Sequence, residues 1–359
     1  MRVIWVRGRE RISFNRPHTF FDLGVRGSGK SSLLESIAEQ YLMKGHTILD
    51  LFGSRDGEGL AWLRSSWAKD RKILLLHGEC VDVEAPCDTR KVQQLTLKDF
   101  EEYDILISAS PLYLNIDDEF INAAHITDKI YRRLSWKRLI FGLVREASNL
   151  YYSRLKVSDN QIFAKSQMIY VLREARHVGL ALGLDSIRFY AIDIDIRSIS
   201  DFTILKSQGI DGLSKDLDWL YSIFHPHRIR NMPPQNFIIL SRRGSIGLGE
   251  FAEIPWHKQE RENILRSVGV KVEYGEPIEQ GDYRGKFKTV GDKEHAQIIH
   301  LYTGEDLSLD RIARKLGRSS RTPHKHINKH NSSVERSGFC PSCRRVKGQH
   351  EAEIAVRGQ

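Results

Sequence analysis

A glycine-rich motif at residues 24–31, Gly-Val-Arg-Gly-Ser-Gly-Lys-Ser, constrains the fold of this chain more than any other feature. It fits G-x-x-x-x-G-K-[ST], a loop whose backbone N–H groups turn inward on a phosphate chain. An apolar run at residues 18–23 precedes the motif, and residues 33–42 behind it carry apolar side chains at helical spacing. A helix N-terminus adds a partial positive charge. The motif therefore predicts a strand, a phosphate-binding loop, a helix and a bound nucleoside triphosphate.

The residue types in this loop predict ATP and Mg²⁺ as cofactors. Lys30 is expected to reach the β- and γ-phosphates, and the Ser31 hydroxyl is expected to ligate Mg²⁺. The alternative is a glycine-rich turn that carries Lys-Ser by chance, and the flanking strand and helix argue against it. The nucleotide-binding set comprises Gly24, Arg26, Gly27, Ser28, Gly29, Lys30, Ser31 and Ser32.

After the loop helix, short apolar runs alternate with helical segments, which predicts a doubly wound α/β sheet. Continuous apolar runs are typical of parallel strands buried on both faces. The basic, glycine-rich residues 242–249 lack the Gly-Lys-Ser ending, so we interpret them as a flexible hairpin at a ring interface or DNA channel. His257 is interpreted as a capping or core histidine. Strands are expected at 47–51, 72–76, 104–108, 138–144, 180–184 and 237–240, and helices at 120–133, 161–177, 194–206, 213–224 and 256–268.

The composition is that of an ordinary globular protein, with 40% hydrophobic and 28% charged residues in a chain of 359. No apolar run approaches the length of a membrane span, and the charged first seven residues do not fit a signal peptide. Four cysteines, two of them in one C-x-x-C, are too few for a disulfide framework. We therefore expect a protein of the reducing cytoplasm with no membrane partner.

The net charge of +9 is concentrated at the C-terminal end. Residues 311–359 hold 12 Lys/Arg against 3 Asp/Glu, whereas the first 310 residues hold 43 of each. A neutral body with a basic end indicates a nucleotide-driven module joined to a reader of double-stranded DNA. We expect a P-loop ATPase domain at 1–276, a polar linker at 277–292 and a DNA-binding region at 293–359.

The region after the linker has the pattern of a helix-turn-helix. Helices are expected at 294–302, at 308–317 and at 318–327, where Pro323 is tolerable only in the first turn. Ile-Ala-x-x-Leu-Gly followed by a serine-arginine start is a familiar pattern of DNA-binding regulators. The alternative is a three-helix bundle for protein contacts, and the local positive charge argues against it. The residues expected to contact DNA are Arg318, Arg321, Lys325, Lys329, Arg344 and Arg345.

Histidines and cysteines near the C-terminus indicate a zinc site. Two histidines one helical turn apart and a C-x-x-C pair are able to complete one tetrahedral site, although a C-x-x-C normally precedes the histidines. His324 or His350 are substitutes, and a plain reduced thiol pair is the alternative. Cys80 and Cys87 are interpreted as lone structural thiols. The expected ligands are His326, His330, Cys340 and Cys343.

The strand expected at 138–144 ends where P-loop ATPases carry a Walker B acid, often followed by a glutamate that polarises the attacking water. Here the following residues are Arg-Glu-Ala-Ser-Asn, and residues 172–179, Leu-Arg-Glu-Ala-Arg-His-Val-Gly, lead into the next apolar strand. An apolar strand with Glu-Ala at its end, a helix, and Arg-His-x-Gly before the next strand resemble the HerA/FtsK-type ATPases. This group includes zonula-occludens-toxin-like and archaeal or viral DNA-packaging ATPases. The resemblance covers roughly residues 15–250, and the P-loop is its individually specific motif.

This resemblance implies a RecA-like core, often hexameric, that pumps DNA with ATP, and hence a homo-oligomer. By position, Lys30 and Ser31 correspond to the Walker A pair, Glu146 to the catalytic glutamate and Asp185 to the polar sensor that closes the next strand. The chain departs from the family pattern at two positions. Arg145 stands where the Walker B aspartate is usual, and Asp185 stands where Gln or Asn is common.

Arg145 leaves several alternatives open. A cation cannot hold Mg²⁺, so either another acid does so or hydrolysis is slow. Asp50, Asp56 and Glu58 follow the second strand and are either candidates for this role or solvated loop carboxylates. Arg145 itself is a candidate phosphate ligand, trans-acting arginine finger or surface ion-pair partner. The leading hypothesis is an ATP-driven motor for DNA translocation, packaging or plasmid and virus maintenance. The alternative is a nucleotide-sensing DNA-binding regulator of transcription or replication with weak turnover.

Overall fold

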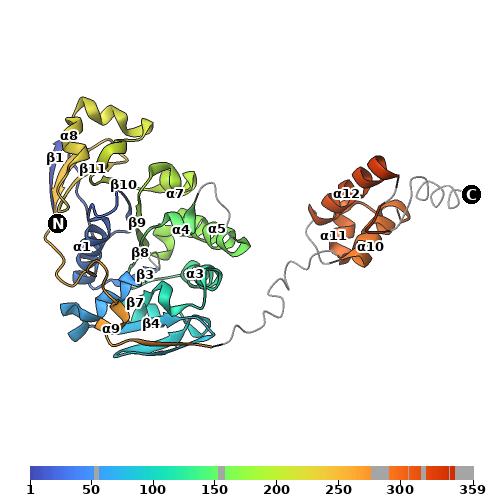
Figure 1. The fold of residues 1–359 in the computed structure, drawn as a ribbon, viewed down its shortest axis with the longest axis horizontal. Coiled ribbons are helices and arrows are strands. Elements are labelled where there is room, and N and C mark those ends of the chain that lie inside the picture. Colours follow the sequence, from blue (N-terminus) through green and yellow to red (C-terminus); the bar gives the residue numbers. More distant parts are fainter. Residues whose placement is uncertain are drawn as a thin grey trace, which may run out of the picture. The chain divides into compact units, whose positions relative to one another are not determined.

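The computed structural model describes residues 1–51, 56–152, 158–275, 291–305, 307–316, 321–338 and 340–343. The chain divides into two compact units, Met1–Pro277 and Ile278–Gln359 (Figure 1). In the described part of the chain, no helix is both long and apolar enough to cross a membrane.

A large mixed sheet forms the centre of the first unit. Across the described residues it has 11 strands in the order β1-β12-β11-β10-β2-β9-β8-β3-β7-β4-β6. A second, antiparallel pair joins β5 (Val81–Glu84) to β13 (Lys271–Tyr274). The strands of the large sheet are β1 (Arg2–Arg7), β2 (Thr19–Leu23), β3 (Thr47–Leu51), β4 (Ile73–His77), β6 (Asp88–Lys91), β7 (Ile105–Ser108), β8 (Ile140–Val144), β9 (Leu180–Ser186), β10 (Phe202–Leu205), β11 (Asn236–Ser241) and β12 (Ile246–Glu250).

The sheet is parallel from β10 to β6 and antiparallel from β10 to β1. Every residue of β2, β3, β8 and β9 is buried, which explains why their sequences are continuous rather than alternating apolar runs. Strand β2 lies between β10 and β9, and β9 separates it from β8. The carboxyl ends of these parallel strands meet at one edge, which is where α/β proteins bind ligands.

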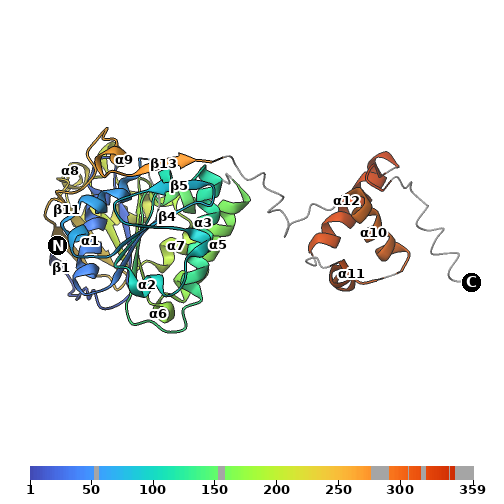
Figure 2. The ribbon, with the colours of Figure 1, turned by 90° about the horizontal axis from the view of Figure 1, so that it is seen from below.

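Helices cover both faces of the sheet (Figure 2). Helix α1 packs on one face through Leu33, Ile37 and Tyr41, in the same cluster as Phe20 of β2. Helices α3 and α5 pack on the other face, in the cluster that holds Phe21, because successive strand side chains point to opposite sides. The helices of this unit are α1 (Lys30–Met43), α2 (Asp99–Glu102), α3 (Ile116–Tyr131), α4 (Ser148–Tyr151), α5 (Asp159–Arg173), α6 (Ala175–Val178), α7 (Ile194–Ile199), α8 (Pro226–Arg230) and α9 (Ile264–Ser267).

The structure confirms the α/β fold class and corrects two expected helices. The segment 194–206 is not one helix, because α7 ends at Ile199 and residues Phe202–Leu205 form β10 beside β2. The segment 256–268 is helical only at Ile264–Ser267. The segment 213–224 forms a 3₁₀ helix at Lys215–Ser222. Residues 242–249 fall in the β11–β12 hairpin, as expected.

The second unit contains three described helices, α10 (Asp292–Thr303), α11 (Leu309–Leu316) and α12 (Arg321–Ser337). Ile298, Ile312 and Ile327, one from each helix, are buried together in a small apolar core. Pro323 lies in the first turn of α12, where its missing N–H costs no hydrogen bond. The helix extends beyond the expected end at residue 327.

Candidate active site

The loop between β2 and α1 needs its glycines. Gly27 and Gly29 have positive φ, 74° and 85°, which is a conformation that other residues adopt only with strain. A Cβ atom on Gly24 would lie 2.5 Å from the Ser28 hydroxyl, and one on Gly29 would lie 2.6 Å from the Pro234 carbonyl oxygen. The backbone therefore makes a tight turn immediately before α1, as a phosphate cradle requires.

The polar groups of this loop fit a phosphate chain. Lys30 is buried and its ammonium donates to the Val25 carbonyl oxygen at 3.1 Å, across the loop. The Ser28 hydroxyl is buried and has no hydrogen-bond partner among the described residues. Within the described structure, no side chain caps the N-terminus of α1 and no acid occupies its first turn. An uncapped helix N-terminus with a buried hydroxyl and ammonium is an anion site.

Asp185, near the end of β9, lies beside the expected magnesium ligand. The Ser31 hydroxyl donates to Asp185 Oδ2 at 3.3 Å, and the backbone N–H of Glu146 donates to Asp185 Oδ1. Asp185 is fully buried, and burial raises the pKa of its carboxyl to about 6 although the charge of Lys30 opposes the shift. The carboxylate thus connects the loop, through Ser31, to the end of β8.

Glu146 follows β8 in a strained conformation. Its φ is 44°, and a non-glycine residue in this region costs on the order of 1 kcal/mol. The side chain is exposed, and Asn149 donates to one of its carboxylate oxygens at 3.4 Å. The hydrogen bond to Asp185 fixes the backbone, so the Glu146 carboxylate is held at the edge of the site and in contact with water.

The side chain of Arg145 is buried among acidic side chains. Only 1% of its side chain is exposed. The guanidinium donates two hydrogen bonds to Asp50, from Nε to Oδ1 at 3.1 Å and from Nη2 to Oδ2 at 2.7 Å. Its Nη1 forms ion pairs with Glu35 at 2.8 Å and with Glu58 at 3.4 Å. The geometry of the Glu35 pair is not that of a hydrogen bond. Burial opposes the charged form, but the three carboxylates outweigh burial and raise the pKa of Arg145. A surface ion pair is therefore the wrong interpretation of Arg145.

His257 completes this group of charges, which we name the Arg145 cage: Glu35, Asp50, Glu58, Arg145 and His257. Glu35, Asp50 and Arg145 are buried, whereas Glu58 and His257 are partly exposed. His257 Nδ1 lies 2.8 Å from Glu35 and Nε2 lies 3.3 Å from Glu58. Burial disfavours the charged imidazole, but the hydrogen bond to Glu35 and the charges of Glu35 and Glu58 outweigh burial and raise the pKa of His257. His257 therefore bridges Glu35 and Glu58, and these two carboxylates favour its charged form.

The other acids that were candidates for holding Mg²⁺ are paired with other side chains. Asp50 also accepts from Trp62 Nε1 at 2.9 Å, so Arg145 and Trp62 together occupy its carboxylate. Asp56 is exposed and pairs with Lys258 at 3.5 Å. Asp185 is thus the acid that the structure brings to the Ser31 hydroxyl.

Two buried charges beside the loop were missed by sequence reasoning. Asp22 lies opposite Asp185 in the β2–β9 register, and neither of its carboxylate oxygens has a hydrogen-bond partner in the part of the chain that the structure describes. Burial raises the pKa of Asp22 well above 3.8, against the charges of Lys206 and Lys30. Burial lowers the pKa of Lys206 to about 8, and its ammonium donates to the Asn236 carbonyl oxygen at 2.9 Å. The signal for Asp22 was a charge inside an otherwise apolar strand.

The residues expected to contact DNA are described only in part. Lys325 and Lys329 are exposed one turn apart on α12. Arg318, Arg344, Arg345 and the side chain of Arg321 lie outside the described residues.

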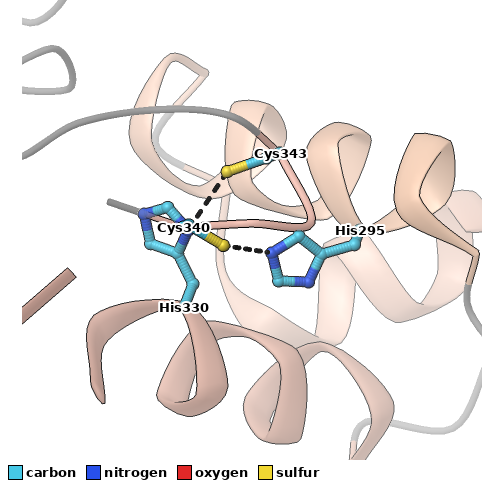
Figure 3. Close-up of side chains that lie close together, drawn as sticks. All are labelled: His295, His330, Cys340 and Cys343. Carbon is cyan, nitrogen blue, oxygen red and sulfur yellow. Dashed lines mark hydrogen bonds between the residues drawn. The ribbon is translucent and has the colours of Figure 1, made fainter. Parts of the chain in front are cut away.

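Three of the four expected zinc ligands lie together, and His295 of α10 completes the group. The ligand atoms of His295, His330, Cys340 and Cys343 all lie within 4.8 Å of one another (Figure 3). His326 instead has its Nδ1 3.1 Å from Nδ1 of His295. Burial, with His326 next in effect, lowers the pKa of His295. The available signal was a histidine on the apolar face of the first helix, one turn before Ile298 and Ile299.

Comparison with known proteins gives similarity at the level of solved structures. No protein-family model matches the sequence, and no curated protein matches it. Similar structures include the genome packaging NTPase B204 from Sulfolobus turreted icosahedral virus 2, at 14% identity over 66% of this chain and 98% of B204, with a TM-score of 0.39. The pCW3 conjugation coupling protein TcpA is 15% identical over 69% of this chain and 65% of its own length, with a TM-score of 0.39. The structure of EccC (ATPases 2 and 3) from Thermomonospora curvata, in complex with a signal sequence peptide, is 14% identical over 68% of this chain and 38% of that solved chain, with a TM-score of 0.38.

The chain's own geometry defines the fold class. A glycine loop with its Lys-Ser pair joins β2 to α1, and β2 lies inside a largely parallel sheet covered by helices on both faces. The unit Met1–Pro277 has the fold of a P-loop NTPase.

Proposed function

We propose that this protein is an ATP-hydrolysing motor that acts on double-stranded DNA as a homo-oligomer. The observation that carries the proposal is the hydrogen bond between Ser31 and Asp185 beside the anion site at the N-terminus of α1. A hydroxyl and a carboxylate at this position are the hard oxygen ligands that Mg²⁺ prefers when it is bound with phosphates.

Each part of the nucleotide has a residue that suits it. The loop amides and Lys30 bind the phosphate chain, the Ser28 hydroxyl gains a phosphate partner, and Ser31 with Asp185 holds Mg²⁺ directly or through water. The metal, when bound, neutralises charge on the phosphates. Asp185 thereby supplies the acid that position 145 lacks. Arg145 does not enter the site, because its guanidinium is engaged by Asp50, Glu35 and Glu58.

Glu146 is the residue that best suits activation of water. Its carboxylate is exposed, while its backbone is tied to Asp185. A carboxylate in this position accepts a proton from the attacking water or orients it. The backbone strain at Glu146 supports this role, since strained residues persist mainly where function needs them.

The second unit suits the reading of DNA. Its residues 311–359 carry a charge excess equal to that of the whole chain, and α12 exposes Lys325 and Lys329 on adjacent turns. Lysines so spaced follow the phosphate backbone, which provides most of the salt-dependent affinity of DNA-binding proteins. We assign α12 as the reader helix of a helix-turn-helix formed with α11.

The test is ATP hydrolysis by the full chain, with and without duplex DNA. The parent protein should hydrolyse ATP with Mg²⁺ and hydrolyse it faster with DNA. Lys30→Ala should abolish binding of ATP with Mg²⁺, because the phosphate chain loses its deep cation. Glu146→Gln should retain binding and stop hydrolysis. Asp56→Asn, at an exposed acid paired with Lys258, is the control and should behave as the parent.

A specific observation keeps a second function in the test. Arg145 occupies the position of the usual Walker B acid, which suits a nucleotide-sensing DNA-binding regulator. Nucleotide-dependent DNA binding with no ATP hydrolysis in any condition would select the regulator and overturn the motor.

A further inference from the structure

Four metal-binding side chains converge in the second unit from three separate segments (Figure 3). His295 comes from α10, His330 from α12, and Cys340 with Cys343 from the segment after α12. His295, His330 and Cys340 are buried, and Cys343 is half-buried. Burial of several sulfur and imidazole ligands at one point distinguishes this group from a scatter of surface residues.

Two sulfur-to-nitrogen distances in this group are close to the edge of a tetrahedron around one zinc ion. Cys340 Sγ lies 3.5 Å from His295 Nε2, and Cys343 Sγ lies 3.3 Å from His330 Nδ1. With Zn–S near 2.3 Å and Zn–N near 2.0–2.1 Å, the S···N edge of a tetrahedral site is about 3.6 Å. Two thiolates with two imidazoles form a ligand set that is typical of structural zinc.

His326 orients one of these ligands. Its Nδ1 is 3.1 Å from Nδ1 of His295, whereas Nε2 of His295 faces Cys340. A metal-binding imidazole commonly donates its other N–H to a neighbour, which fixes the tautomer and the ring orientation. His326 is therefore a partner that positions His295 rather than a ligand.

The small apolar core explains why a metal is useful here. Among the residues that the structure describes in this unit, the buried apolar cluster consists of Ile298, Ile299, Leu301, Ile312 and Ile327, with Leu307, Leu309 and Leu316 partly buried against it. A unit of this size rarely gains enough stability from so few apolar side chains, and a metal is a common supplement. The four ligands join α10 to α12 and fasten the segment after α12 to both.

We propose that the second unit holds one structural Zn²⁺ ion, bound by His295 Nε2, His330 Nδ1, Cys340 Sγ and Cys343 Sγ, with His326 positioning His295. The ion links α10 to α12. The site itself does not depend on the proposed motor function, because its ligands all belong to the second unit.

The experiment measures metal content of the full chain, purified through a tag that contains no histidine. Elemental analysis should find one zinc per chain. Cobalt(II) exchanged into the wild-type protein should give the intense visible bands of a tetrahedral site and charge-transfer bands from thiolate. This arm needs no variant and so does not depend on the folding of a mutant.

Substitutions then identify the ligands. Cys340→Ser with Cys343→Ser should abolish zinc binding, and the matched control, Cys80→Ser with Cys87→Ser, should retain one zinc per chain. His295→Asn should lose the ion in the presence of a competing chelator. His326→Asn should retain the ion under saturating zinc but bind it about 10–100-fold more weakly, as expected for a positioning residue.

Several results would overturn the proposal. They are a metal-free parent protein with reduced Cys340 and Cys343, a disulfide between these two cysteines in the purified protein, or a cobalt spectrum without thiolate bands. Loss of zinc in His326→Asn together with full retention in His295→Asn would show that the ligand set is wrong. Loss of zinc with intact ATP hydrolysis would leave the motor proposal untouched.

Discussion

The Ser31 hydroxyl donates to the Asp185 carboxylate, Oγ to Oδ2 at 3.3 Å, although the two residues lie 154 positions apart in the chain. Ser31 is the second residue of the P-loop helix α1 and Asp185 is the penultimate residue of the strand β9, so the parallel pairing of β2 with β9 brings them together. We propose the edge that holds this carboxyl and hydroxyl as the binding site for a magnesium ion.

Asp185→Asn should remove most of the dependence of nucleotide binding on Mg²⁺. The amide keeps the hydrogen bond from Ser31 but lacks the charge that attracts the metal. We expect the rate of ATP hydrolysis to fall by about 10²–10³-fold, which is typical of the loss of one electrostatic contact in an active site. Titration of the parent and the variant with ATP, once with Mg²⁺ and once with EDTA, measures how much Mg²⁺ increases the affinity for ATP. Equal enhancement by Mg²⁺ in variant and parent would show that Asp185 does not hold the metal.

Arg145→Met should destabilise the protein strongly. Removal of the guanidinium leaves Asp50 as a buried carboxylate without its cation and leaves Glu35 with His257 alone, and breaking such a buried pair costs about 3–5 kcal/mol. Urea unfolding measures this loss. The matched control is Arg132→Met, because Arg132 is exposed and pairs with Asp128 on the helix surface, where the loss is about 0–1 kcal/mol. Equal stability of the two variants would show that the Arg145 cage contributes nothing.

His257 should make the stability of the fold depend on pH. Its pKa is higher in the folded protein than the ordinary value of 6.5, so the charged imidazole favours folding. The contribution is fully present below pH 6.5 and is lost as the pH rises through the folded pKa. His257→Gln should remove it, so the free energy of unfolding of the parent should exceed that of the variant at low pH, and the difference should shrink as the pH rises. A difference that grows with pH would contradict this.

Lys325→Ala with Lys329→Ala should weaken binding to duplex DNA regardless of its sequence. If each lysine neutralises one phosphate, the slope of log K against log[salt] should fall in magnitude by about 2. Fluorescence anisotropy at several salt concentrations measures the slope. Lys72→Ala, which removes an exposed lysine from the first unit, is the control. An unchanged slope in the double variant would exclude this face of α12 from the phosphate contacts.

The sequence predicted the elements whose character depends on local pattern. The P-loop, its helix and the strands β3 and β8 follow from apolar runs and glycine spacing. These patterns lie within one short segment and can be recognised without knowing what the segment packs against. Strand β10 was mistaken for part of a helix, because Phe-Thr-Ile-Leu becomes a strand by pairing with β2, a partner far away in the chain. Tertiary pairing of this kind overrides local propensity.

The same division between local pattern and distant pairing applies to the candidate sites. Lys30 and Ser31 are fixed by a contiguous motif, whereas the Asp50–Arg145 pair spans 95 residues and follows from the adjacency of β3 and β8. His295 lies 31 residues before His326, and the packing of α10 against α12 determines which of them meets the cysteines. Such contacts join segments that are distant in the sequence, so they are seen only once the fold is known. No fixed spacing between the residues in the sequence indicates them.

The burial of Arg145 also restricts how this protein can change by mutation. An aspartate at position 145 would meet Glu35, Asp50 and Glu58 with no guanidinium among them, and so would bring a fourth carboxylate into a largely buried group. Restoring the usual acid therefore requires neutral replacements within the cage before the arginine is exchanged. The order in which these positions change therefore decides whether each intermediate keeps its buried carboxylates paired with a cation.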